Sequence, residues 1–197
     1  EKVVDILRSS PADLVHAEVY LCMRVFLCRF ASQHLTGFWP IILTEMVRIL
    51  AQAKVDLPAD KSDRLQLVFS VVKLADFLIT LQTDDFQIHQ WLLITDTPDA
   101  TNPASSYMAD SLLDCLAKFV SECQRELVFD ANDSLERAQQ RRPLLQMSSV
   151  ATISTLQPFF ATASRAFYQC DFHATLGWDN INACLLHDLF EPIHTNT

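Results

Sequence analysis

Glycine is nearly absent from this chain: only two of its 197 residues are glycine, Gly37 and Gly177. Ordinary proteins contain about 7% glycine. Tight hairpin turns and phosphate-binding loops need the backbone freedom that glycine provides, whereas a helix interior is weakened by it. The scarcity of glycine therefore predicts an all-α fold and argues against a phosphate-cradling loop.

Apolar residues recur at helical spacing along most of the chain. They stand three and four positions apart, which is the pattern of a helix with one face in a core. The stretches that show this pattern are 35–50, 63–82, 107–128, 142–170 and 179–190. The first ten residues, EKVVDILRSS, have helical character as well.

Three further segments carry more specific expectations. The stretch 19–30 is apolar nearly all round, so it is expected to form the central helix, with Ser10 as its N-terminal cap. Pro158 lacks a backbone N–H and is expected to kink or split the helix over 142–170. The segment 86–94 can be read as a short helix or as an extended piece.

Together these stretches make about six or seven amphipathic helices joined by moderate loops. We predict one all-α domain over 1–197, either an irregular antiparallel bundle or the end of a HEAT/armadillo-like α-solenoid. The tail from about 191 to 197 is expected to be disordered or irregular. The chain begins without methionine inside a helical pattern, so we interpret it as a fragment of a larger protein.

The charge balance limits the classes of partner. The formal net charge of −9 argues against nucleic-acid binding, which needs a basic face. No apolar run approaches the length of about 18 residues that a transmembrane helix needs, and no signal-peptide pattern is present. We therefore expect no nucleic-acid partner and no transmembrane segment.

Two cysteine–histidine pairs near the end of the sequence raise the question of a metal. Cys170 and His173 form one pair, and Cys184 and His187 form the other, which is a plausible set of zinc ligands. Both pairs also fall in or beside amphipathic helices, where ordinary packing explains them. We predict that the chain binds no metal, with a zinc site as the alternative.

No motif for catalysis is recognisable. A nucleophile elbow, a Walker loop and an HExxH pair are all missing, and His16, His34 and His89 have no evident partner in the sequence. We predict that the chain has no catalytic residue and no cofactor and is not an enzyme.

Arginine is concentrated in one region, through Arg125, Arg137, Arg141 and Arg142. Such a group is usually a solvated surface feature. Guanidinium groups could also bind an anionic lipid headgroup or an acidic patch on a partner protein. These four residues are therefore candidates for headgroup or acidic-partner binding.

The stretch 19–50, VYLCMRVFLCRFASQHLTGFWPIILTEMVRIL, resembles the C-terminal region of the Dopey family of large Golgi and endosome trafficking proteins. In that family a mostly aliphatic helix ending in arginine leads to an S/P-Q-H-L-T-x-Ω-W-P turn and a further helix. The matching positions are Arg24, Arg29, Gln33, His34, Leu35, Thr36, Trp39, Pro40, Thr44 and Glu45.

Two later blocks resemble the family in the same order. The first matches through Lys73, Asp76, Phe86, Gln87 and Trp91, and the second is LQPFFATASRAF at 156–167. The sequence departs from the family at Gly37, where serine is expected, and the part beyond Cys170 matches poorly.

The resemblance implies a non-enzymatic scaffold or interaction domain on the cytosolic face of Golgi and endosome membranes, acting in Golgi and endosome-to-Golgi traffic. It implies a cytoplasmic, peripheral membrane protein. The implied partners are a large Golgi scaffold related to Arf exchange factors and, further, a phospholipid flippase. The alternative function is binding of a phosphoinositide or another anionic headgroup that helps recruit the protein to Golgi membranes.

The family motif around His34, Leu35, Trp39, Pro40 and Trp91 is expected to be structural. Trp39 is predicted to be a core anchor, since large aromatic side chains dominate cores. Glycine in the turn just before it is expected to leave room for the neighbouring aromatic rings, although serine would also be accepted there. Pro40 suits the first turn of a helix.

Overall fold

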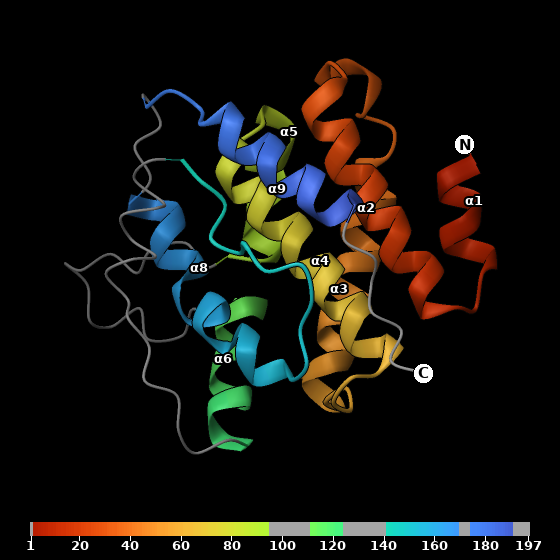
Figure 1. Cartoon of the computed structure of the whole chain (residues 1–197), viewed down its shortest axis with the longest axis vertical. Helices are drawn as coiled ribbons and strands as arrows, with labels where there is room; N and C mark the ends of the chain where they lie inside the picture. The colour runs from red at the N-terminus through yellow and green to blue at the C-terminus, as the bar shows by residue number, and fades with distance from the viewer. Residues whose placement is uncertain (1, 95–110, 124–140, 170–173, 191–197) are drawn as a thin grey trace.

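A computed structural model describes residues 2–94, 111–123, 141–169 and 174–190, and all regular structure in these residues is helical (Figure 1). The all-α prediction is therefore confirmed. The α-helices are α1 (Lys2–Ser9), α2 (Asp13–Arg29), α3 (Trp39–Val55), α4 (Asp63–Leu81), α5 (Asp84–His89), α6 (Leu112–Cys123), α8 (Gln157–Gln169) and α9 (Trp178–Phe190). Short 3₁₀ helices are η1 (Ser32–His34), η2 (Gln90–Leu92) and η4 (Ile153–Leu156).

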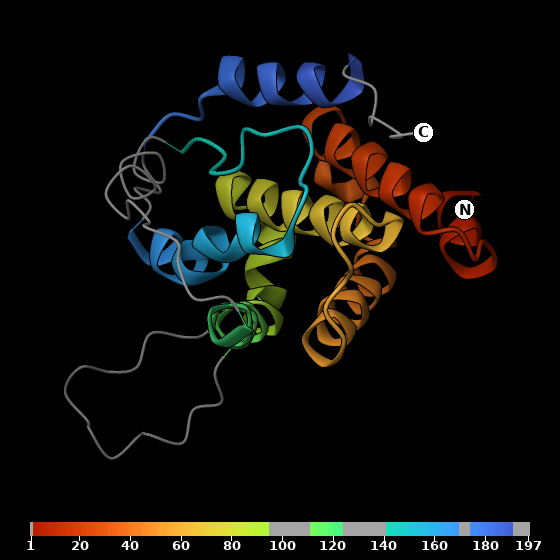
Figure 2. The ribbon, with the colours of Figure 1, turned by 60° about the horizontal axis from the view of Figure 1, so that its bottom comes forward.

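Helix α4 is the central element of the fold. Every side chain from 71 to 82 is buried, and α2, α3 and α8 pack around the helix (Figures 1 and 2). Helix α9 lies outside this layer and packs on α2. The expectation that 19–30 forms the central helix was wrong, because Cys22 and Phe30 reach the surface. The apolar pattern favoured 19–30 over α4 because α4 contains the charged residues Lys73 and Asp76. Both are buried and have partners inside the protein.

Helices α2 and α3 begin later than the sequence predicted. The N-cap of α2 is Ala12, and the Ser10 hydroxyl accepts the N–H of Ala12 at 3.3 Å instead of capping the helix. Helix α3 starts at Trp39 because η1 and a turn precede it, so the helix does not extend back to residue 35. Pro40 occupies the first turn of α3, as expected.

The segment 141–152 contains no helix, so the predicted helix over 142–170 was wrong in its first part. Hydrogen bonds to α4 hold this segment instead. The N–H groups of Leu144 and Leu145 donate to the Asp76 carboxylate, and the Gln66 amide donates to the Val150 carbonyl. Helix α8 begins only at Gln157, so Pro158 lies in its first turn and does not kink it.

The remaining predicted helices are present with adjusted bounds. The ambiguous segment 86–94 is helical as far as Leu92, in α5 and η2. Helix α9 starts at Trp178, and Asp179 lies in its first turn. The ends of the predicted 107–128 helix and the tail 191–197 lie outside the described residues.

The turn before α3 behaves partly as predicted. Trp39 is 3% exposed and Leu35 is also buried, so the core-anchor prediction is confirmed. A Cβ atom added at Gly37 would have no neighbour within 4 Å, so another residue would be accepted there. Glycine is therefore not required at position 37, as expected, and the idea that it leaves room for the aromatic rings was wrong, because that space is open.

Within the described residues, no single helix has the length and apolar composition needed to cross a membrane. One pair, Asp63–Leu81 with Asp84–Leu92, passes by length and composition only when counted together, and it is bent by 115°.

Candidate functional site

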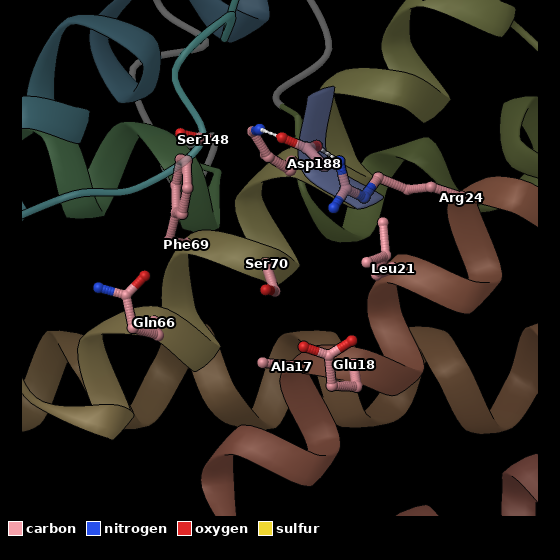
Figure 3. Close-up of a pocket in the computed structure, with 10 residues that line it drawn as sticks. Ala17, Glu18, Leu21, Arg24, Gln66, Phe69, Ser70, Ser148 and Asp188 are labelled. Carbon is pink, nitrogen blue, oxygen red and sulfur yellow. Dashed lines mark hydrogen bonds and ion pairs between the residues drawn. The ribbon is translucent and has the colours of Figure 1, made fainter. Parts of the chain in front are cut away.

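Four charged side chains meet in the interior where α2, α4 and α9 come together. Arg24 comes from α2, Lys73 and Asp76 from α4, and Asp188 from α9. The Asp188 carboxylate forms two ion pairs: one oxygen pairs with Nη1 of Arg24 and the other with Nζ of Lys73 (Figure 3). Arg24, Lys73 and Asp76 are each at most 3% exposed, and the Asp188 side chain is 6% exposed. We call these four residues the buried charge cluster.

Aromatic rings support both cations of the cluster. The Arg24 guanidinium lies 5.5 Å from the centroid of the Phe77 ring, and Lys73 Nζ lies 5.0 Å from that of Phe69. Burial lowers the pKa of Lys73, while Asp188 acts in the opposite direction. Arg24 Nε is buried and has no hydrogen-bond partner in the part of the chain that the structure describes. Removing two such cations from water is costly, so the carboxylate between them matters.

Asp76 connects the cluster to the non-helical segment 141–152. Its two carboxylate oxygens accept the N–H groups of Leu144 at 3.0 Å and Leu145 at 2.8 Å. Burial raises the pKa of Asp76 to about 6, and the two N–H groups and Lys73 oppose this rise. The side chain thus provides acceptors to a segment that makes no helical hydrogen bonds of its own.

The raised pKa of Asp76 predicts a pH dependence of stability. Because the folded-state pKa of about 6 exceeds the ordinary value of 3.8, the folded state binds more protons between these values. The free energy of unfolding that Asp76 contributes should therefore rise as the pH falls from 7 to 5, by roughly 1 kcal/mol. Urea titration of the wild type and Asp76→Asn at both pH values measures this. The same pH response in both proteins would contradict it.

A small cavity of about 30 Å³ adjoins the cluster, between α2, α4 and the segment that carries Ser148 (Figure 3). Polar side chains of Glu18, Gln66 and Ser70 line it together with Arg24. A volume of this size accommodates one or two water molecules.

Two of the four candidate arginines, Arg141 and Arg142, lie in the described residues, and their surroundings differ. Arg141 is half-buried, and its guanidinium donates to the carbonyls of Thr80, Leu81 and Ala174 at 2.9–3.4 Å. It thereby satisfies carbonyls at the C-terminal end of α4, which have no partner within the helix. Arg142 is exposed. Arg125 and Arg137 lie outside the described residues.

Replacing Arg141 with methionine is expected to lower the free energy of unfolding by about 2 kcal/mol, because charge-assisted bonds to buried carbonyls are lost. Arg142→Met is the matched control, since its side chain is exposed and a change below about 0.5 kcal/mol is expected. Chemical denaturation of both variants checks the prediction. Equal losses would mean that the carbonyl contacts of Arg141 contribute nothing.

The two cysteine–histidine pairs are only half described. Cys184 is half-buried in α9 and burial raises its thiol pKa, while His187 is exposed. Cys170 and His173 lie outside the described residues. Among the residues that the structure places, no group of three or more His, Cys, Asp or Glu could hold a metal ion.

The residues of the structural family motif fall into two sets. Leu35 and Trp39 are buried, whereas His34 and Pro40 are exposed. Trp91 is 63% exposed and lies at the surface beside α5. The motif positions Arg24, Lys73 and Asp76, which we had not singled out as a site, belong to the buried charge cluster.

Sequence reasoning missed Asp188 because it lies in the part beyond Cys170 that resembles no family motif. A signal was nevertheless present. Asp188 follows Ile181 by seven positions and Leu185 by three, so it lies on the apolar stripe of α9. A charged residue on an apolar stripe needs a buried partner.

Helix α9 also exposes several of its apolar side chains. Four of its large hydrophobic side chains are exposed, and we call them the outer α9 face. They are Trp178 at 44%, Leu186 at 52%, Leu189 at 49% and Phe190 at 79%.

Comparison with known proteins identifies the family. Residues 1–172 match the family described as DOP1 C-terminal. Protein DOP1B of Mus musculus is 27% identical over 201 residues, covering 85% of this chain and 9% of the relative. Protein dop1 of Emericella nidulans is 31% identical over 121 residues, covering 58% of this chain and 6% of the relative. Protein pad-1 of Caenorhabditis elegans is 30% identical over 135 residues, covering 62% of this chain and 6% of the relative.

No solved structure matches the chain significantly. The chain spans less than a tenth of the length of these curated relatives. The match covers most of the chain and confirms the resemblance to the Dopey family found in the sequence motifs. The chain belongs to the DOP1 family, to its C-terminal region.

Proposed function

We propose that this domain is a non-enzymatic scaffold in Golgi and endosome-to-Golgi membrane traffic, and that it docks a protein partner on the cytosolic membrane face. Membership of the DOP1 family supports the trafficking role. The outer α9 face carries the proposal of docking. It places four large exposed apolar side chains on one 13-residue helix, and exposed apolar surface gathered in one place is typical of interaction sites.

The partner we propose is the large Golgi scaffold related to Arf exchange factors, with a phospholipid flippase as a further member of the assembly. A neighbouring helical surface of such a scaffold could pack on the outer α9 face as one helical layer packs on another. Trp178 and Phe190 would supply large rings of the kind that dominate binding energy at interfaces.

Charge substitution on the outer α9 face tests the proposal. The full-length protein carrying Leu186→Glu and Phe190→Glu should recover at least about 10-fold less of the purified Golgi scaffold than the wild type, a loss of about 1.4 kcal/mol. Val55→Glu is the matched control, because Val55 is 84% exposed on another helix. Equal recovery by the wild type and the double variant, with unchanged circular dichroism, would contradict the proposal.

Headgroup binding has less support, because Arg141 already donates to three backbone carbonyls. Arg142 is the described candidate whose guanidinium is exposed. Flotation with vesicles that contain or lack phosphoinositides distinguishes the two functions. Recovery that depends on phosphoinositide and falls in Arg142→Glu would favour the headgroup function.

A further inference from the structure

Helix α9 attaches to the rest of the domain through one narrow stripe. Its buried side chains are Ile181 and Leu185, and Asp188 continues the stripe one turn further. The helix lies as a separate layer on top of the others (Figure 2). A hydrogen bond from Arg29 to Asn182 at 3.0 Å adds a contact at the rim. Elements attached by few buried side chains belong to the low-stability end of a protein.

The surface beneath α9 requires a negative charge. Arg24 and Lys73 both direct their charged groups at the position of the Asp188 carboxylate. They belong to α2 and α4, and α9 covers them, so any helix packed at this position must bring a carboxylate or leave both cations buried and unpaired. Buried cations left without a carboxylate would be strongly unfavourable. We call this surface the α9 seat.

The α9 seat and its occupant are separate in the sequence. Residues 1–172 match the DOP1 C-terminal family, and this range includes both cations of the seat. Helix α9, at 178–190, lies outside the range. Arg24 and Lys73 thus belong to the matched domain, whereas Asp188, whose carboxylate pairs with them in this chain, lies outside it.

We propose that the α9 seat is a docking groove for an amphipathic helix that carries a carboxylate on its apolar face, and that α9 fills this groove in cis. The partner is a protein helix with the pattern of α9, in which aliphatic residues precede the acid by seven and by three positions. This helix displaces α9 and gives its carboxylate to Arg24 and Lys73. The proposal differs from docking on the outer α9 face, because it concerns the stripe of the helix that carries Ile181, Leu185 and Asp188.

Tethering makes α9 a strong competitor for its own seat. A segment joined by a short linker acts at an effective concentration in the millimolar range. A partner helix must therefore bind the seat more tightly than α9 does, or α9 must first be weakened. The Asp188→Asn variant weakens the cis helix while keeping its size.

A labelled peptide of residues 178–190 tests the proposal by fluorescence anisotropy under reducing conditions. We expect the Asp188→Asn chain to bind this peptide at least about 10-fold more tightly than the wild-type chain does, because the cis competitor is weakened. A peptide carrying Asn at position 188 should bind the variant chain at least about 10-fold more weakly than the native peptide does, because it brings no carboxylate. Equal binding of the two peptides, or no binding up to about 1 mM, would overturn the proposal.

Hydrogen exchange on the wild-type chain gives a second test that needs no variant. Amides of α9 should exchange at least about 10-fold faster than those of α4, through an opening that leaves α4 protected. Exchange of α9 only by the same global unfolding that exposes α4 would show that α9 is a permanent part of the core and would overturn the proposal.

Discussion

Replacing Trp39 with alanine is expected to lower the free energy of unfolding by about 3–5 kcal/mol. The side chain is 3% exposed at the start of α3, and its loss would leave a cavity against the core that includes Leu35. Urea denaturation followed by circular dichroism measures the loss. Removing a ring of this size is costly because the surrounding helices relax only in part.

The same substitution at Trp91 is the matched control for Trp39. Trp91 is 63% exposed, so Trp91→Ala should change the free energy of unfolding by less than about 1 kcal/mol. A loss below about 1 kcal/mol at Trp39 as well would mean that the turn before α3 does not anchor the core.

Replacing Asp76 with alanine is expected to cost about 3 kcal/mol at neutral pH, because two buried N–H groups would lose their acceptors. Those groups belong to Leu144 and Leu145, so the segment 141–152 should lose protection from hydrogen exchange first. Denaturant titration measures the total, and exchange locates it. The loss is moderated by the cost of burying the ionised carboxylate, which is the cause of its raised pKa.

Asp60→Ala provides the comparison for Asp76, because Asp60 is exposed in the loop before α4. A change below about 0.5 kcal/mol is expected there. If Asp76→Ala were as mild as Asp60→Ala, water or another group would have to satisfy Leu144 and Leu145, and the role given to Asp76 would be wrong.

Helix positions could be predicted well where local periodicity decided them. The stripe of Leu65, Phe69 and Val72 marked α4, and its N-cap Ser62 accepts the N–H of Leu65 as a helix start requires. The stripe over 35–50 marked α3, although the turn before Trp39 was absorbed into it. Apolar periodicity shows which face of a helix is buried, but it locates the first residue of the helix poorly.

The candidate site could be predicted only in part, because its members are far apart in the chain. Arg24 and Asp188 are separated by 164 positions, and Lys73 and Asp188 by 115. No pattern within a short stretch of sequence predicts which buried charged residues will form ion pairs. The motifs contained three of the four members, Arg24, Lys73 and Asp76. The ion pairs of Arg24 and Lys73 are made with Asp188, however, and no motif marked that residue.

The segment 141–152 shows how tertiary contacts override a local preference. Its apolar spacing is compatible with a helix. The Asp76 carboxylate nevertheless accepts two of its N–H groups, and the Arg141 guanidinium donates to a carbonyl at the end of α4. Bonds of this kind replace helical hydrogen bonds when a neighbouring element offers better partners.

The amino-acid sequence by itself determined that the chain is helical, that Trp39 lies in the core and that the motifs resemble one family, because each of these depends on residues close together in the chain. Only the tertiary structure decided that α4 is the centre, that 141–152 stays unwound and that α9 covers Arg24 and Lys73. Those outcomes depend on which charges can be buried together, since a buried charge is stable only beside a partner that folding brings to it.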